Sequence, residues 1–140
     1  MDDPAGARAL TTEAPLAIPA DLEATLVLVR HGESELIVQR RFQGSAETPL
    51  SATGRRQAAL VARRLARPQA PPALPLPDGA PLAIVHSPLG RATETATAIE
   101  GALRADDGFG LAIPRRADQR LREIGQGEWE GRLASEIEAA

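Results

Sequence analysis

The chain has 140 residues, of which 43% are hydrophobic and 25% charged, and its formal net charge is −3. This composition fits one folded domain better than two domains or a disordered polymer. The 16 basic residues are scattered among 19 acidic ones, so we expect no nucleic-acid partner. The absence of cysteine excludes disulfides, thiolate metal sites and a cysteine nucleophile. We expect a cytoplasmic protein without membrane contact, because neither a signal-peptide pattern nor a span of membrane length is present.

The first elements of the chain are a predicted tail and a predicted strand. Residues 1–23 contain three prolines among small and acidic residues and are expected to form a flexible N-terminal tail. The folded domain is then expected over residues 24–140. Its first apolar run, Ala24–Val29, lacks polar alternation, which is typical of a strand buried on both faces of a parallel sheet.

A helix is predicted after Ser51, a residue type suited to the N-cap position. Ala58, Val61 and Leu65 recur at helical spacing and would form its apolar face. Residues 68–81 contain six prolines, so they end this helix and predict an extended surface connection.

The second half of the chain repeats the order of strand and helix. Leu82–Val85 is a second apolar run, and Ser87 and Pro88 are suited to the N-cap and first turn of a following helix. The apolar stripe of that helix comprises Ala92, Ala96, Ile99 and Leu103. A short strand over 109–113 and a last helix over 133–137 complete the prediction.

This order of elements predicts an α/β domain, a three-layer sandwich with a mostly parallel sheet, helices on both faces and right-handed crossovers. Ligands of such folds bind beyond the carboxyl ends of the strands, where Arg30 and His31 follow the first strand. Arg91 lies in the first turn of a helix whose Ser-Pro start leaves N–H groups free to face an anion. Two guanidiniums and a helix N-terminus around one imidazole indicate a site for a phosphoryl group.

Four groups of residues, in chain order, resemble a known family. They are Arg30-His31-Gly32-Glu33-Ser34; Arg41-Phe42-Gln43-Gly44 with Pro49-Leu50-Ser51, Gly54 and Gln57-Ala58; Ser87-Pro88-Leu89-Gly90-Arg91-Ala92 with Thr95-Ala96; and Leu121-Arg122-Glu123 with Gly127-Glu128-Trp129-Glu130-Gly131. From residue 26 to about 137 the chain is similar to the histidine phosphatase (phosphoglycerate mutase-like) superfamily. The resemblance implies that residues 24–140 are the N-terminal part of such a domain, lacking its C-terminal portion.

The resemblance also implies a reaction, the hydrolysis of a phosphomonoester through a phosphohistidine intermediate on His31. Glu123 would be the proton donor of this reaction, and the substrate would be a small phosphorylated metabolite. No metal and no cofactor would be required. The remaining site residues implied by the family are Arg30 and Arg91 for phosphate binding and Gln43 and Gly44 on the substrate side.

The chain departs from the family pattern at two places. The second catalytic histidine of the family, near the C-terminus, has no counterpart among the two histidines of the chain. The other one, His86, follows a different strand and is expected to pack at the rim of the pocket, with a substitute role for the missing histidine as the alternative. Ile37 stands where the family often has Asn, which removes a hydrogen bond worth on the order of 1 kcal/mol.

Several alternatives stay open at this point. The motif at 127–131 favours the phosphatase branch, but phosphoglycerate mutase-type phosphoryl transfer and a non-catalytic phospholigand-binding domain are rivals. Glu123 is also consistent with a solvated carboxylate, Trp129 with a packing anchor, and Ser34 with either a phosphate contact or a local turn. A further alternative is that the 140 residues do not fold stably alone, because a parallel sheet that lacks its last strands exposes an edge. The oligomeric state is open.

Overall fold

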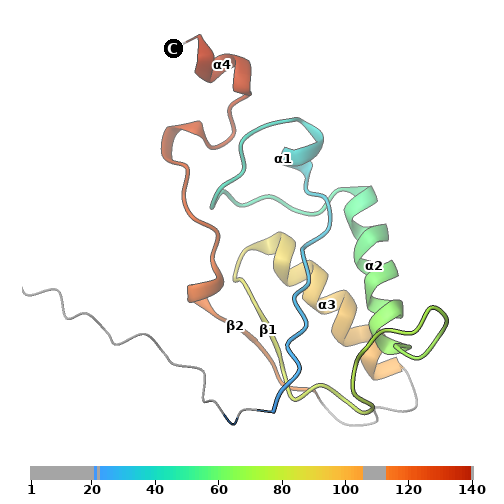
Figure 1. Ribbon diagram of the computed structural model, residues 1–140. Helices are drawn as coiled ribbons and strands as arrows, with labels where there is room; N and C mark the ends of the chain where they lie inside the picture. The colour runs from blue at the N-terminus through green and yellow to red at the C-terminus, as the bar shows by residue number, and fades with distance from the viewer. Residues whose placement is uncertain (1–20, 22, 106–112, 140) are drawn as a thin grey trace, which may run out of the picture.

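The computed structural model describes residues 21, 23–105 and 113–139. Most of the tail predicted over 1–23 therefore lies outside the described residues, as do residues 109–112 of one predicted strand. In chain order the elements are α1 (Glu35–Val38), α2 (Ala52–Ala66), β1 (Ile84–His86), α3 (Gly90–Ala105), β2 (Arg115–Ala117), two 3₁₀ turns, η1 (Gln119–Leu121) and η2 (Gly127–Trp129), and α4 (Ala134–Glu138) (Figure 1).

Helix α2 begins where the sequence predicts. The Ser51 hydroxyl accepts a hydrogen bond from the Gly54 N–H at 3.0 Å, which satisfies one of the free donors of the first turn. The buried face carries Ala58, Ala62 and Ala66, so the expected stripe is shifted toward the alanines, and the larger residues Val61 and Leu65 are only partly buried.

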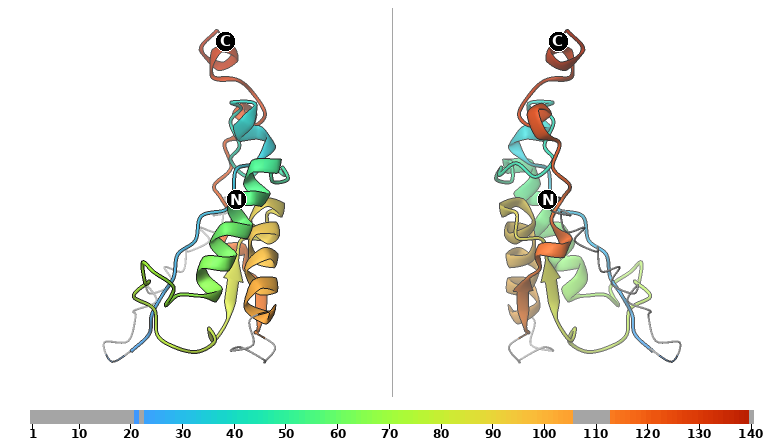
Figure 2. Two further views of the ribbon diagram at one scale, coloured as in Figure 1. Left: turned by 90° about the vertical axis from the view of Figure 1, so that its right-hand side faces the viewer. Right: turned by 90° about the vertical axis from the view of Figure 1, so that its left-hand side faces the viewer.

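A β-α-β unit forms the second half of the fold. Strands β1 and β2 are parallel neighbours, with Ile84 opposite Arg115 and His86 opposite Ala117, and α3 connects them. The predicted α/β class with parallel strands and helices is confirmed. Figure 2 shows α2 and α3 lying against each other, with α3 also in contact with β1.

The main apolar core lies between the two long helices and the sheet. Its buried members are Ala62, Ala66, Ile99, Leu103 and Ile113, and the partly buried Ile84 of β1 packs against them. Three members of the predicted α3 stripe, Ala96, Ile99 and Leu103, are buried, which confirms the helical periodicity read from the sequence.

The first predicted strand is wrong. Ala24–Val29 has no regular structure, and Leu26 and Leu28 are 82% and 86% exposed. A strand buried on both faces needs strands on its edges and layers above and below. Within the described residues this segment pairs with no strand, so its apolar composition alone does not make it one.

The strand predicted over 109–113 is also displaced. The observed strand β2 lies at Arg115–Ala117, beyond the predicted range. Both arginines are exposed, but the Nε–H of Arg115 donates to the Glu100 carboxylate of α3 at 2.6 Å. Alternating or apolar side chains are therefore not required here, because a parallel partner and an ion pair hold this short strand.

The C-terminal segment runs back along an earlier part of the chain. The Phe42 N–H donates to the Arg132 carbonyl at 2.9 Å, and the Gly131 N–H donates to the Phe42 carbonyl at 2.8 Å. Beyond these contacts the predicted last helix is present as α4, which projects past α1 (Figures 1 and 2). Trp129 packs against Phe42 with ring centroids 5.7 Å apart, as expected of a packing residue, although it stays half exposed.

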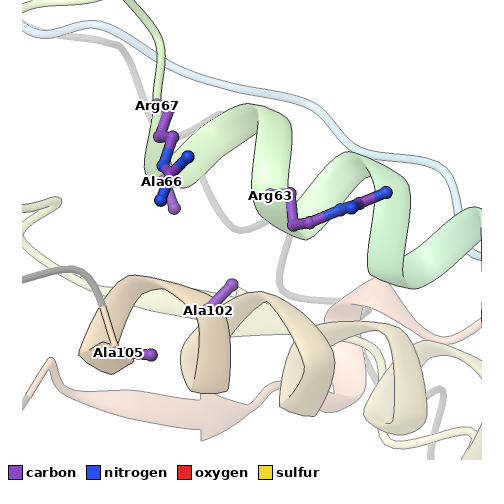
Figure 3. Close-up of a pocket in the computed structure, with 5 residues that line it drawn as sticks. All are labelled: Arg63, Ala66, Arg67, Ala102 and Ala105. Carbon is purple, nitrogen blue, oxygen red and sulfur yellow. The ribbon is translucent and has the colours of Figure 1, made fainter.

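A hollow of about 400 Å³ lies between the C-terminal halves of α2 and α3 (Figure 3). It is lined by Arg63, Ala66, Arg67, Ala102 and Ala105, and the small alanine side chains leave the space open. At about 1.5 Å per helical residue, Ala102 lies roughly 16 Å along α3 from Arg91. None of the helices in the described ranges is long and apolar enough to cross a membrane.

Candidate functional site

Three of the residues predicted for the site meet at one small pocket. His31, Arg91 at the start of α3 and Glu123 after η1 line a hollow of about 80 Å³. Its other lining residues are Ser87, Leu89, Ala92 and Leu121. Segments 92 residues apart in the sequence thus place an imidazole, a guanidinium and a carboxylate around the same space.

Arg91 is the most deeply buried of these side chains, with 1% of its surface exposed. Its Nη1 donates to the Ala46 carbonyl at 2.9 Å and its Nη2 to the Gly44 carbonyl at 2.7 Å. The Nε–H is buried and has no hydrogen-bond partner among the described residues. An unpaired buried donor costs about 1–3 kcal/mol, so this guanidinium is prepared to donate to an additional acceptor.

The charges around Arg91 partly offset the cost of its burial. Burial lowers the pKa of Arg91 from its ordinary value, while the carboxylates of Glu123, Glu47 and Glu130 act in the opposite direction. The positive charge of Arg122 acts in the same direction as burial. An anion that enters the pocket would replace solvent around an already oriented donor.

The His31 ring is held in one tautomer by its own backbone. Its Nδ1 lies 2.7 Å from the Gly32 carbonyl, and since a carbonyl oxygen only accepts, Nδ1 carries the proton. The lone pair of the neutral ring is then on Nε2, which is the form a nucleophile requires.

Gly32 and its neighbours fix the position of this backbone. The Gly32 N–H donates to the Thr95 hydroxyl at 3.2 Å, and that hydroxyl donates to the Arg91 carbonyl at 2.8 Å. A side chain at Gly32 would collide with the carbonyl of Gly54 in the first turn of α2. Glycine at this position therefore allows the close packing of two backbone segments.

Arg30 is not brought to the pocket. Its side chain is exposed, and it is not among the lining residues. The preceding segment, expected to be a buried strand, has no regular structure, so no sheet directs Arg30 toward the ligand side.

Gln43 and Gly44 support the site without lining the pocket. The Gln43 side-chain oxygen accepts a hydrogen bond from the hydroxyl of Ser34, which also caps α1. Gly44 is buried with φ of +46°, and its carbonyl is a partner of Arg91. Ser34 therefore belongs to a local turn, which settles one of the alternatives left by the sequence.

The start of α3 differs from the prediction. The helix begins at Gly90, not at Ser87 or Pro88, and the Gly90 N–H donates to the Glu47 carboxylate at 3.0 Å. The Leu89 N–H donates to the Ser87 hydroxyl at 3.4 Å. These two donors are thus already used, whereas the Nε–H of Arg91 has no partner among the described residues.

His86 lies outside the pocket and has both ring nitrogens engaged. Nδ1 donates to the Ser87 carbonyl at 2.7 Å, and Nε2 accepts from the Arg115 guanidinium at 3.3 Å. It does not take the place of a second histidine at the pocket. Among the described residues no cluster of three or more potential metal-ligating side chains is present.

Glu130 is a site-supporting residue that the sequence did not reveal. Its carboxylate accepts a hydrogen bond from the Ser45 N–H at 2.7 Å, 85 residues away in the chain. The sequence signal that could have revealed Glu130 is its place in the motif at 127–131. The spacing of that motif does not identify Ser45 as its partner, because Ser45 lies 85 residues away.

The chain matches known proteins over most of its length. It is 38% identical over 115 residues to glucosyl-3-phosphoglycerate phosphatase of Mycolicibacterium vanbaalenii, covering 82% of this chain and 43% of that protein. It is 40% identical over 105 residues to the probable phosphoglycerate mutase GpmB of Proteus mirabilis, covering 75% and 40% respectively. The chain thus spans less than half the length of these curated relatives.

Solved structures of related proteins also match most of this chain and less than half of their own length. The mycobacterial glucosyl-3-phosphoglycerate phosphatase in complex with VO3 superimposes with a TM-score of 0.60 at 34% identity, covering 78% of this chain and 43% of that one. The YhfR protein of Bacillus stearothermophilus gives a TM-score of 0.60 at 38% identity, covering 79% and 45%. Residues 26–140 match the histidine phosphatase superfamily (branch 1). The chain belongs to this superfamily.

Proposed function

We propose that this chain carries a phosphatase site that hydrolyses phosphomonoesters through a phosphohistidine on His31. The observation that supports this proposal most is the buried Arg91 side chain, which has an unpaired Nε–H and lines one pocket together with His31 and Glu123. A phosphoryl oxygen would satisfy that donor, and a guanidinium is well suited to the charge of a phosphoryl group.

The first step is the transfer of the phosphoryl group to the histidine. The lone pair on Nε2 of His31 attacks phosphorus and forms the P–N bond, while the P–O bond to the alcohol breaks. Glu123, as a carboxylic acid, gives its proton to the departing alkoxide. The buried guanidinium of Arg91 stabilises the charge on the phosphoryl oxygens in the transition state.

The second step regenerates the enzyme. A water molecule attacks phosphorus, and the Glu123 carboxylate takes a proton from that water. The P–N bond breaks, its electron pair returns to Nε2, and inorganic phosphate leaves. The exposed position of Glu123 gives it access to water for this second role. Arg30, adjacent to His31, is proposed as a second phosphate-binding cation, with its exposed side chain free to change rotamer.

The proposed substrate is a small phosphorylated sugar or acid, the class named for the mycobacterial relatives. Gln43 and Gly44 are proposed to act on the substrate side by shaping the loop that Arg91 holds. A phosphoglycerate mutase-type transfer is the second candidate, because the Proteus mirabilis relative carries that name.

Trapping the intermediate tests the proposal. The chain is incubated with a small phosphomonoester that carries a radiolabelled phosphoryl group, and the protein is then precipitated. We expect an acid-labile, alkali-stable label on the wild-type chain and on His86→Ala, the matched control, and none on His31→Ala. A folded wild-type chain that binds phosphate but never becomes labelled would favour non-catalytic phospholigand binding.

The two candidate reactions differ in their products. With 3-phosphoglycerate and catalytic 2,3-bisphosphoglycerate, the phosphatase releases inorganic phosphate. Isomer formation without phosphate release would show the mutase reaction instead.

A further inference from the structure

One oxygen of the Glu130 carboxylate holds two distant segments together. Its Oε1 accepts three hydrogen bonds, from the Ser45 N–H at 2.7 Å, the Gln126 N–H at 2.9 Å and the Ser45 hydroxyl at 3.0 Å. Ser45 belongs to the loop at 44–46. Gln126 is the last residue of the segment 122–126, which contains Glu123 and which we call the Glu123 segment. The carboxylate thus joins this loop, which we call the Arg91 loop, to the Glu123 segment.

The Arg91 loop is fixed on its other side by the site itself. Arg91 donates to the carbonyls of Gly44 and Ala46, which flank Ser45. A Cβ on Gly44 would lie 2.5 Å from Glu130 Oε1, so only glycine lets the carboxylate approach this closely. The chain of contacts runs without a gap from the phosphate-binding cation through the loop to Glu130.

The Glu123 segment has little else to hold it. Residues 122–126 contain no helix or strand, and Glu123 is exposed. Apart from Glu130, the described tie to the Arg91 loop is the Arg122 guanidinium, which donates to the Ser45 carbonyl at 3.2 Å. Removing the charge of Glu130 would therefore loosen the segment on the side where Glu123 reaches the pocket.

The negative charge is needed for this arrangement. A carboxylate oxygen that accepts three donors is strongly favoured over a neutral amide oxygen. In agreement, hydrogen bonds from the Gln126 and Ser45 backbones lower the pKa of Glu130, and the nearby positive charge of Arg122 acts in the same direction.

We propose that Glu130 is a positioning residue of the phosphatase reaction, which holds Glu123 at the pocket by clamping its segment to the Arg91 loop. This inference rests on the proposed function. Glu130 itself touches neither substrate nor phosphorus.

The leaving group of the substrate distinguishes positioning of the acid from a general structural role. Glycerol phosphate leaves as an alkoxide and needs the proton of Glu123, whereas p-nitrophenyl phosphate leaves as a stable phenolate without it. We expect Glu130→Gln to slow phosphoenzyme formation from glycerol phosphate roughly 10- to 100-fold, the cost of a misplaced catalytic group. With p-nitrophenyl phosphate the change should stay below about threefold, because general acid catalysis contributes little there.

Glu128→Gln is the matched control. Glu128 lies two residues away and is exposed, and its side chain makes no hydrogen bond or ion pair among the described residues. It should behave as wild type with both substrates. Trp129, the single tryptophan of the chain, reports the clamp directly, and its quenching by acrylamide should increase in Glu130→Gln but not in Glu128→Gln.

The possible failures are distinct. Equal slowing of both substrates by Glu130→Gln, or unchanged rates with both, overturns the positioning role while leaving the phosphatase intact. A wild-type chain that forms no phosphoenzyme from either substrate overturns the proposed function, and the positioning role falls with it.

Discussion

The helical core and the site are held together in different ways. Between α2 and α3 the contacts are apolar and come from side chains at regular helical spacing, such as Ile99 and Leu103. Around the pocket, charged side chains reach backbone groups far away in sequence, as Arg91 reaches Gly44 and Ala46. Apolar burial thus builds the scaffold, whereas a few charge-assisted hydrogen bonds decide where the reactive groups lie.

Among the substitutions proposed here, Arg91→Met should cause the largest loss of stability. It leaves the carbonyls of Gly44 and Ala46 without their donor and is expected to lower the free energy of unfolding by about 4 kcal/mol. Arg91→Lys should not restore it, because an ammonium lacks the planar fork of donors. Urea unfolding followed by circular dichroism measures the loss, with the exposed Arg104→Met of the same helix as control. Equal stability of the Arg91 and Arg104 variants would contradict the role of Arg91 in holding the loop at 44–46.

Leu103→Ala tests the apolar contacts between α2 and α3. Leu103 is 4% exposed in the core between α2 and α3, and its truncation should cost roughly 3 kcal/mol through lost burial and the cavity left behind. The same urea titration measures this cost. Because the core only supports the site, orthophosphate should still protect the folded variant against thermal unfolding, as it does not in Arg91→Met. Loss of that protection in Leu103→Ala would show that phosphate binding also depends on the apolar core.

Gly44→Ala tests the backbone of the Arg91 loop. At φ of +46° a Cβ is strained and would meet Glu130, so we expect a loss of about 1–3 kcal/mol in the free energy of unfolding. Gly101→Ala is the control, because Gly101 lies inside α3 with open space around it. That substitution should instead stabilise the chain by about 0.5–1 kcal/mol. A neutral Gly44→Ala would show that the loop adapts.

Acid should release the clamp with the smallest energetic effect. The folded pKa of Glu130 is below its ordinary value of 4.5, so its contribution is complete above that pH and is lost as pH falls through the folded pKa. Arg122 and Arg91 face it as fixed cations, and Arg41, which donates to the Gly131 carbonyl, pairs with Glu136 nearby.

Trp129 fluorescence measured between pH 7 and pH 3 follows this release. The emission should be constant above pH 4.5 and change below it, and Glu130→Gln should remove the difference. An identical titration in that variant would assign the change to another carboxylate.

The features that the sequence predicts well are local or carried by motifs. The N-cap Ser51 and the stripe Ala96, Ile99 and Leu103 depend only on neighbouring turns of one helix, and periodicity reports them. His31, Arg91 and Glu123 were proposed from motifs, and the structure places all three at one pocket.

What escaped prediction depends on tertiary partners. The apolar run at 24–29 reads as a strand, but strand formation requires neighbours that its own residues do not specify. The exposed Arg115 and Arg116 lie in a strand because of pairing with β1. The motif at 127–131 contains Glu130 but does not reveal its partner, because Ser45, which donates two of its three hydrogen bonds, is brought close only by the fold.

The contact between Gly32 and Gly54 has a consequence for how the protein tolerates mutation. Every other amino acid adds a Cβ, which at Gly32 would overlap the Gly54 carbonyl and at Gly54 the carbonyl of Glu33. Saturation mutagenesis under selection for folded protein should therefore accept no replacement at either position, whatever its polarity or size. The backbone beside His31 is thus protected from drift by steric exclusion alone, independently of any demand that the chemistry imposes.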